Sequence, residues 1–598
     1  MTTTHEIRFE GEVSVPMRDG TRLAADLYRP ATGRFPALLE RTPYDKRRPV
    51  LIEAGRYLAA RGYAVVMQDV RGRFGSEGEF RFLSPQEGPD GYDTLEWIVR
   101  QQWCDGQVGT MGLSYSTATQ QALAVLHPPS LKAQFLLDGG YDYGHRTVRH
   151  SGAFEMGVML PYAYRMARES RELAADPKAR AEFEAAWAAV RDWLFTLRGL
   201  QGWPPSPLPT AYERWYSTVL RHADDGGYWE QPTVNLAAHV DAYPDIPVFH
   251  ETSWYGHHVW ATTTRYRELR TRLRSPQRLL IGPWLHGHDE FGRSWCGDVD
   301  FGGEAVLGAL NDLRLRWFDR WLKGSRSGAD EEPPVRIFVM GGGSGRRNAE
   351  GRLEHGGHWR DEPEWPLART RWTTLYLHRG GDLRPEPPPA GAAPSTYAFD
   401  PRNPVPTIGG NTQTPLLPRL IQGGAFDQRC RSALWVCRGT QALAERPDVL
   451  VFQTEPLAED TEVTGPLTVR LWISSSTPDT DFTAKLIDVH PPSADWPAGF
   501  AMNLTDGIVR ARSARPQPLR AGEICELTIE PPPVGNLFKA GHRIRLDVSS
   551  SNFPHFDANP NTGEPLGGAT RLQAALNTVW HDAARPSHVV LPVISEDA

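Results

Sequence analysis

The stretch from Val108 to Tyr115 constrains the fold of this 598-residue chain more than any other. Val108-Gly-Thr-Met111 is a short apolar run that is typical of a buried strand, and Gly112-Leu113-Ser114-Tyr115 follows it directly. This pattern predicts a tight strand-to-helix turn with the serine at its corner. Because such a turn lifts the hydroxyl out of the sheet and into a cleft, Ser114 is a candidate nucleophile.

Short apolar runs alternate with helical stretches on both sides of this turn. The runs are Pro36–Glu40, Tyr63–Met67, Lys132–Leu137, Ile246–Phe249 and Arg278–Ile281. This alternation predicts an α/β fold, with a mostly parallel sheet covered by helices on both faces. Ahead of them, Asp19-Gly20 between two alternating runs predicts a hairpin over residues 13–28.

The alternation breaks between residues 141 and 245, where an Ala-, Glu- and Arg-rich stretch predicts an inserted helical cap. The apolar residues there recur at helical spacing, as in Phe183, Trp187, Val190, Leu194 and Leu197. A last helix is predicted over Glu304–Lys323, ended by Gly324. The chain is too long for one core. We therefore expect an α/β sheet domain in two parts (1–140 and 246–350), the cap (141–245) and a further domain (351–598).

Beyond residue 350, Pro-rich turns separate short alternating strands. In Arg543–Val548, the pattern predicts that Ile544, Leu546 and Val548 face inward while Arg543, Arg545 and Asp547 face outward. Many short strands with Gly and Pro turns predict an all-β sandwich or jelly roll.

Composition excludes several classes of partner. A net charge of −7 without long basic runs argues against nucleic acid, and no run of ~20 apolar residues predicts a membrane span. The N-terminus lacks the pattern of a secretory signal, and the five cysteines are scattered without CxxC spacing. We therefore expect a cytoplasmic enzyme. No glycine pattern for a nucleotide is present, so no cofactor is expected; the sequence leaves a homo-oligomer open.

A serine needs a base, and His286 is the best candidate. It follows the Arg278–Ile281 run, so it is expected at the carboxyl edge of the sheet, where Ser114 also lies. His288 is the alternative base.

The chain resembles the family of cocaine esterase, α-amino-acid ester hydrolases and X-prolyl dipeptidyl peptidases. The matching segments run in order from end to end and include Met17–Leu23, Arg41–Tyr44, Asp69–Gly78, Gly109–Tyr115, Gly282–His286, Trp317–Gly324, Asp400–Gly410, Arg446–Leu450, Val463–Gly465 and Ser551–Pro554. The resemblance implies an α/β-hydrolase domain with a helical cap and a C-terminal jelly roll. It also implies Ser114 as nucleophile, His286 as base and then acid, and an oxyanion hole made of the Tyr115 backbone N–H and the Tyr44 hydroxyl.

The sequence departs from the family pattern twice. In the family, the strand-to-helix turn around the nucleophile usually ends in glycine, but this chain has Ser116 at that position. Because serine is small, we expect modest strain and no loss of the turn. More seriously, the triad acid of the family lies in a Gly-Trp-Tyr-Asp segment, and in this chain Gly256 holds the aspartate position.

Three explanations stand for the missing acid. The acid has moved, to Glu251 at the end of the same strand, which we favour, or to Asp138 at the end of the preceding parallel strand. Alternatively, the enzyme uses a Ser–His dyad, or the site has lost its activity. Replacing a triad Asp lowers turnover about 10⁴-fold in the serine-protease template, so the choice matters.

Nearby histidines do not predict a metal. His250 and Glu251 with His257 and His258 lack H-E-x-x-H or comparable spacing and cross a strand and a loop, so no metal site is expected. Three aromatic side chains beside the inferred triad positions are predicted to line the substrate pocket: Trp254, Tyr255 and Trp284.

Together these features predict a serine hydrolase that cleaves an ester or amide of a small acyl or aminoacyl compound through an acyl-enzyme. The alternatives are an acyltransferase or cyclising enzyme using a Ser–His dyad, and a catalytically degenerate binding protein.

Overall fold

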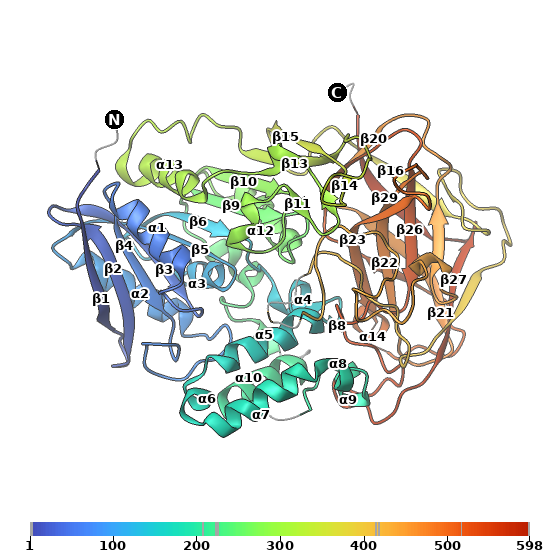
Figure 1. The fold of residues 1–598 in the computed structure, drawn as a ribbon, viewed down its shortest axis with the longest axis horizontal. Helices are drawn as coiled ribbons and strands as arrows, with labels where there is room; N and C mark the ends of the chain where they lie inside the picture. The colour runs from blue at the N-terminus through green and yellow to red at the C-terminus, as the bar shows by residue number, and fades with distance from the viewer. Residues whose placement is uncertain are drawn as a thin grey trace.

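A computed structural model describes residues 4–205, 208–221, 226–412, 416, 419–515 and 517–595. Figure 1 shows a hydrolase-type sheet with its helices at the N-terminal side and a β-sandwich at the C-terminal side. The helices α5 (Met156–Arg168), α7 (Pro177–Ala188) and α10 (Thr210–Arg221) lie along one edge of both. No helix among the described residues combines the length and apolarity that crossing a bilayer requires.

The hydrolase sheet begins with the predicted hairpin and continues with parallel strands. Its order is β1-β2-β4-β3-β5-β6-β9-β10-β13, in which β1 and β2 are antiparallel and the strands from β4 to β13 are parallel. The strands are Ile7–Pro16, Arg22–Pro30, Ala64–Asp69, Phe35–Thr42, Cys104–Leu113, Leu131–Leu137, Val248–Ser253, Gln277–Gly282 and Val335–Gly341. The α/β prediction is confirmed.

Strand residues alternate between two buried helical layers, which is why the strands are apolar throughout. Leu38 packs in a cluster with α1 (Pro49–Ala59) and α13 (Leu310–Lys323), while its neighbour Leu39 packs in a cluster with the opposite helices. Those opposite helices are α2 (Glu87–Val99), α3 (Tyr115–Ala124) and α12 (Val259–Arg272).

The predicted last helix ends where expected and starts later. Gly324 ends α13 with φ 65°, the left-handed conformation that favours glycine at this position. The helix begins at Leu310 rather than at Glu304, because Gly303–Ala305 forms a separate 3₁₀ turn.

Residues 143–242 form a mainly helical segment around a core of their own. That core contains Phe183, Trp187, Val190 and Leu194, as the spacing predicted, together with Tyr115 from the start of α3. Leu197, which the spacing also assigned to this face, is only half-buried and is not part of the core. The segment also contacts the sandwich: Trp203 Nε1 donates to the Gly567 carbonyl at 2.7 Å. These helices therefore connect the turn at Ser114 with the C-terminal half.

The C-terminal half is built mainly of strands, and most of its described strands belong to two sheets. In the larger one, β29 (His588–Ile594) pairs with β16 (Thr370–Leu377), β20 (Thr461–Gly465) and β21 (Thr468–Ser475). The second sheet has the order β19-β26-β22-β23, with bounds Leu450–Gln453, Arg543–Ser549, Asp481–His490 and Phe500–Arg510. The two parts of the molecule are joined where β13 pairs with β25 (Val534–Phe538).

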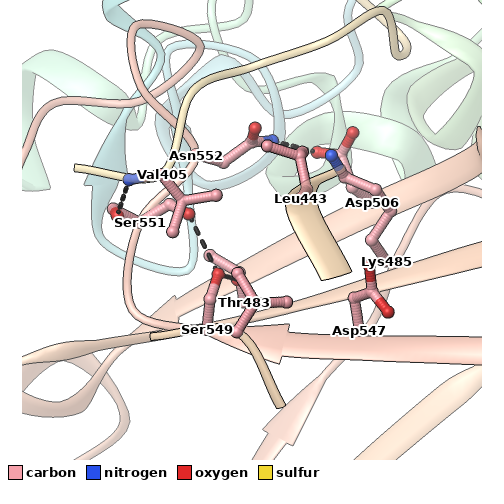
Figure 2. A pocket seen from close by; sticks show the side chains of 10 residues that line it. Val405, Leu443, Thr483, Lys485, Asp506, Asp547, Ser549, Ser551 and Asn552 are labelled. Carbon is pink, nitrogen blue, oxygen red and sulfur yellow. Dashed lines mark hydrogen bonds between the residues drawn. The ribbon is translucent and has the colours of Figure 1, made fainter. Parts of the chain in front are cut away.

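One prediction about β26 is wrong. Ile544, Leu546 and Val548 are buried as expected, but Arg545 and Asp547 are also buried, at 7% and 6% exposure, and form a two-bond ion pair. Apolar side chains from described residues between 405 and 449, among them Val405, Leu443 and Val449, cover this face. Figure 2 shows the small cavity of about 20 Å³ left beneath them, where Asp547 lies near Lys485 and Asp506.

Candidate active site

Ser114 occupies the corner between β5 and α3 with φ 64° and ψ −117°. Residues other than glycine rarely adopt this backbone conformation, which costs on the order of 1–3 kcal/mol. Gly112 permits the turn, because a Cβ there would lie 2.4 Å from the Cβ of Ser116. Ser116 itself is buried in the first turn of α3, so the turn persists without the usual final glycine.

The acid that pairs with His286 is Asp138. His286 Nδ1 donates to Asp138 Oδ2 at 2.6 Å, and Thr252 Oγ1 donates to Oδ1 at 2.6 Å. Burial alone would raise the pKa of Asp138, but the hydrogen bond and charge of His286 hold it below its ordinary value. Because Nδ1 carries the proton, Nε2 of His286 keeps a lone pair for a base's role.

Strand register brings this pair to Ser114. Leu113 at the end of β5 is opposite Leu137 at the end of β6, and the Ser114 N–H donates to the Leu137 carbonyl at 2.9 Å. Ser114 and Asp138 therefore follow directly from paired ends of neighbouring strands. His286 arrives after β10, two strands further along the same edge.

The preference for Glu251 as the partner of His286 is wrong. Its Oε1 accepts a 3.5 Å bond from Ser253 Oγ, and its Oε2 has no hydrogen-bond partner among the described residues. Burial, with the nearby charge of Asp138, raises the pKa of Glu251 well above its ordinary value. A raised pKa favours the uncharged carboxyl, so Glu251 is poorly suited to supply the charge that a triad acid provides.

The absence of a side chain at Gly256 leaves room for the carboxyl of Asp138. A Cβ placed on Gly256 would lie 2.7 Å from Asp138 Oδ2 and 3.2 Å from its Cγ. The carboxyl of Asp138 thus fills the space beside His286 that a side chain from position 256 would enter.

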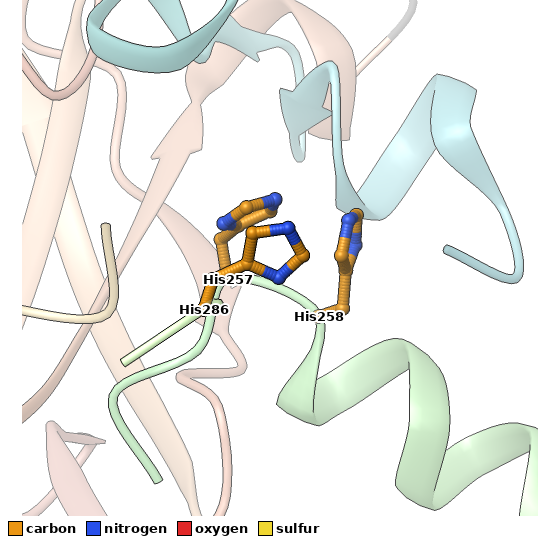
Figure 3. A group of neighbouring side chains, drawn as sticks. All are labelled: His257, His258 and His286. Carbon is orange, nitrogen blue, oxygen red and sulfur yellow. The ribbon is translucent and has the colours of Figure 1, made fainter. Parts of the chain in front are cut away.

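Two further histidines lie against His286. Figure 3 shows the rings of His257, His258 and His286 gathered together, with centroids 4.4 Å apart for 257–286 and 5.5 Å for 258–286. Burial lowers the pKa of His257 and His258 well below the ordinary value, so both are neutral. One ring nitrogen from each of the three lies within 4.8 Å of the others, a geometry that sequence spacing did not predict.

His250 and His288 do not join this group. His250 lies inside β9, where Gln277 Oε1 is 3.1 Å from its Nε2 and Arg265 Nε is 3.2 Å from its Nδ1. His288 is half-buried, and desolvation of its ring followed by the charge of Arg314 lowers its pKa well below the ordinary value. Asp138 contacts His286, which favours His286 over His288 as the base.

The two tyrosines of the predicted oxyanion hole lie near the corner. Tyr115 begins α3, so its N–H is one of those a helix leaves without an internal partner. Its hydroxyl is used elsewhere, donating to Glu87 Oε1 at 2.8 Å. Tyr44 follows β3, and its half-buried ring packs edge-on against Tyr162 with the Arg165 guanidinium 4.9 Å from the ring centre.

The three aromatic residues predicted to line the pocket lie in the core instead. Trp254 and Trp284 are 1% exposed and donate from Nε1 to the carbonyls of Phe338 and Ala305 at 2.6 and 2.9 Å. Tyr255 is fully buried, and its hydroxyl donates to the Asn503 carbonyl at 3.0 Å. The Tyr255 bond links the hydrolase sheet to the sandwich, and side chains that are buried to this degree present no free face to a substrate.

Comparisons with known proteins identify the family of this chain. The X-Pro dipeptidyl-peptidase (S15) family model matches residues 19–288, and the X-Pro dipeptidyl-peptidase C-terminal non-catalytic domain matches residues 327–590. Cocaine esterase of Rhodococcus sp. (strain MB1 Bresler) is 35% identical over 97% of this chain and 98% of its own length.

Solved structures give the same result. An aminopeptidase from a marine sediment Thaumarchaeota archaeon aligns with a TM-score of 0.78 at 26% identity, over 100% of this chain and 97% of that one. An α-amino acid ester hydrolase aligns with a TM-score of 0.77 at 25% identity, over 99% and 97%. The chain therefore belongs to the X-Pro dipeptidyl-peptidase (S15) and cocaine esterase family, and it is an α/β-hydrolase of the serine esterase and amidase type.

Proposed function

We propose that this enzyme cleaves an ester or amide of a small acyl or aminoacyl compound through an acyl-enzyme on Ser114. The 2.6 Å bond between His286 Nδ1 and Asp138 Oδ2, beside the Ser114 corner, carries the proposal. It supplies the acid that position 256 lacks, and so removes the reason for a dyad mechanism.

In the first step, His286 Nε2 takes the proton of the Ser114 hydroxyl while its oxygen attacks the substrate carbonyl carbon. The Asp138 carboxylate keeps the Nδ1 proton in place and stabilises the imidazolium that forms. It is suited to this because it stays ionised: a hydroxyl donor and an imidazole donor hold it, and its pKa is lowered.

The negative charge that develops on the carbonyl oxygen needs donors. The backbone N–H of Tyr115 and the hydroxyl of Tyr44 are proposed for this, since one follows the nucleophile and the other follows the neighbouring strand β3. Losing one such donor costs roughly 10²–10³ in rate, which is about 3–4 kcal/mol of barrier.

In the second step, the tetrahedral intermediate collapses and the leaving alcohol or amine takes the proton from His286 Nε2. Water then gives a proton to the same nitrogen and attacks the acyl-enzyme, which releases the acid and restores Ser114. An aminoacyl group is a good first substrate class to test, because the aminopeptidase and the amino acid ester hydrolase share the fold over the whole chain.

Labelling with a fluorophosphonate probe tests the nucleophile. The wild type should be labelled and Ser114→Ala should not. Ser116→Ala, which removes the hydroxyl two residues further along the chain, is the matched control and should be labelled. Labelling that persists in Ser114→Ala would contradict the assignment. Product analysis of aminoacyl and simple acyl esters, with and without an added amine, then separates hydrolysis from acyl transfer.

A further inference from the structure

A second group of histidines lies far from Ser114, inside the β-sandwich. His355, Asp488 and His490 each offer one ligand atom within 4.8 Å of the other two, and all three side chains are buried. Asp488 and His490 are two residues apart on β22, so both point to the same face of that strand. His355 lies between β14 (Leu353–Glu354) and β15 (Gly357–Glu362).

His490 leaves a ring nitrogen without a partner in this enclosed place. Its side chain is 7% exposed, and Nε2 has no hydrogen bond among the described residues. That atom is 3.9 Å from Asp488 Oδ2, beyond hydrogen-bond distance. A buried polar atom without a partner needs an explanation, and an ion between these two atoms would provide one.

The surrounding residues orient the three groups as metal ligands are usually oriented. His355 Nε2 donates to Asn536 Oδ1 at 2.8 Å, which leaves its other ring nitrogen for another partner. Asp488 accepts from His542 Nδ1 at 2.8 Å and from Asn536 Nδ2 at 3.1 Å. Ligating histidines and carboxylates are commonly fixed by such outer hydrogen bonds. Burial lowers the pKa of His355 and of His490, which suits neutral, lone-pair-bearing rings.

We propose that His355, Asp488 and His490 form a buried site for a divalent first-row cation, with Zn²⁺ the best match. Two imidazoles and one carboxylate are a usual zinc donor set, completed by water as a fourth ligand. Ligands on a tetrahedral zinc lie about 3.3 Å apart, so closure from at most 4.8 Å takes side-chain shifts of up to about 1.5 Å.

The site would join three parts of the sandwich. Asp488 and His490 belong to the four-stranded sheet, His355 to the β14–β15 loop, and Asn536 to β25 of the larger sheet. An ion held there would fasten the two sheets and the loop at one end. Binding free energy of this kind adds directly to the free energy of unfolding, because the unfolded chain has no assembled site.

Metal uptake by the full-length enzyme tests the site. Protein stripped with EDTA is incubated with Zn²⁺, separated from free ion and assayed for bound zinc. We expect about one equivalent per chain and a higher Tm in the zinc-loaded protein. Wild type that holds less than about a tenth of an equivalent, with no change in Tm, would overturn the proposal.

Variants locate the ion. His490→Gln and His355→Gln should each weaken zinc binding at least about 10-fold. The exposed His127, replaced by Asn in His127→Asn, is the matched control and should bind zinc as wild type does. His257→Gln should also keep its zinc; loss in that variant together with retention in His490→Gln would place the ion at the candidate active site and refute the proposal.

A direct measurement covers the case in which a buried variant does not fold. Anomalous diffraction at the zinc edge from wild-type crystals grown with Zn²⁺ should show a peak between His490 Nε2 and Asp488 Oδ2. A map without density there would exclude the site, whatever the variants do.

Discussion

Two buried aspartates in this molecule each accept a short bond from a histidine Nδ1, and their surroundings differ. His286 Nδ1 lies 2.6 Å from Asp138 Oδ2, and the His286 side chain is 18% exposed. His542 Nδ1 lies 2.8 Å from Asp488 Oδ1, and the His542 side chain is 9% exposed. The first pair stands at a sheet edge beside a serine. The second is enclosed by His355, His490 and Asn536.

The comparison teaches that the carboxylate–imidazole pair does not by itself define a role. What decides it is the partner of the remaining ring nitrogen. At the sheet edge, Nε2 of His286 is available to a hydroxyl and to substrate, which suits proton transfer. Inside the sandwich, only other buried groups can be reached, which suits stabilisation.

Removing the acid at the sheet edge should have the largest effect. Asp138→Asn should lower kcat by about 10⁴-fold, because an amide cannot hold the imidazole in the required tautomer or stabilise its charged form. Steady-state kinetics on an aminoacyl or acyl ester, with circular dichroism to confirm folding, measure this. Glu251→Gln is the matched control and should remain within about 3-fold of wild type, since burial already favours the uncharged form of Glu251. Equal losses in both variants would sink the assignment of Asp138.

A methyl group at position 256 should disturb the same pair less severely. Gly256→Ala places a Cβ about where Asp138 Oδ2 now approaches at 2.7 Å, so the carboxyl must shift. Misplacement by a fraction of an ångström to an ångström lowers turnover up to about 10²-fold. The kcat should fall while fluorophosphonate labelling of Ser114 survives, only slower. Unchanged kcat would mean that the carboxyl does not fill this space.

The enclosed pair should affect stability rather than rate. Asp488→Asn should lower the free energy of unfolding by about 3 kcal/mol, because it takes the charge away from a buried carboxylate with several donors. Chemical denaturation measures the change, and kcat should stay within about 3-fold of wild type. A large loss of kcat in folded protein would show that the two sites are coupled.

The pH dependence of stability should separate the two carboxyls at the sheet edge. The pKa of Glu251 is raised, so its cost to folding grows as pH rises above 4.5, up to the folded pKa. The pKa of Asp138 is lowered, so its contribution is complete above 3.8 and is lost as pH falls through the folded value.

These opposite signs give a measurable contrast. Glu251→Gln should gain stability over wild type on going from pH 4 to pH 7, by up to about 1.4 kcal/mol per pH unit. Asp138→Asn should lose stability relative to wild type at pH 7, and the difference should shrink below pH 3.8. Thermal unfolding at several pH values tests both. Parallel pH curves for the two variants would contradict a neutral Glu251 beside an ionised Asp138.

Sequence patterns were sufficient where local chemistry sets the outcome. The hairpin at Asp19-Gly20, the corner at Ser114 and the end of α13 at Gly324 each depend on turn residues, and each was predicted correctly. The position of His286 at the sheet edge followed from strand order. The identity of its acid did not, because it depends on whether a side chain from β6 or β9 reaches the ring, a tertiary distance.

The other errors have the same origin. Trp254 follows β9 in the chain, but its ring turns into the core, where it meets Phe338. The alternation of β26 predicted a solvent-exposed face, but apolar side chains such as Val405, Leu443 and Val449 cover it. The His355 group joins residues more than a hundred positions apart; only Asp488-Val-His490, two ligand types on one face of a strand, could have suggested it.

Strand β13 joins the two parts of the molecule that the two family models match separately. It pairs with β15 along one side, and along the other side first with β10 and then, at Met340 and Gly341, with β25, so the boundary between the matched segments runs through a continuous ladder. A chain cut after residue 350 would expose that ladder as a raw edge of unpaired peptide groups. The N-terminal half should therefore not fold as a separate soluble fragment, and we expect such a fragment to self-associate. In the whole chain, strands of the C-terminal half pair with this edge and cover it.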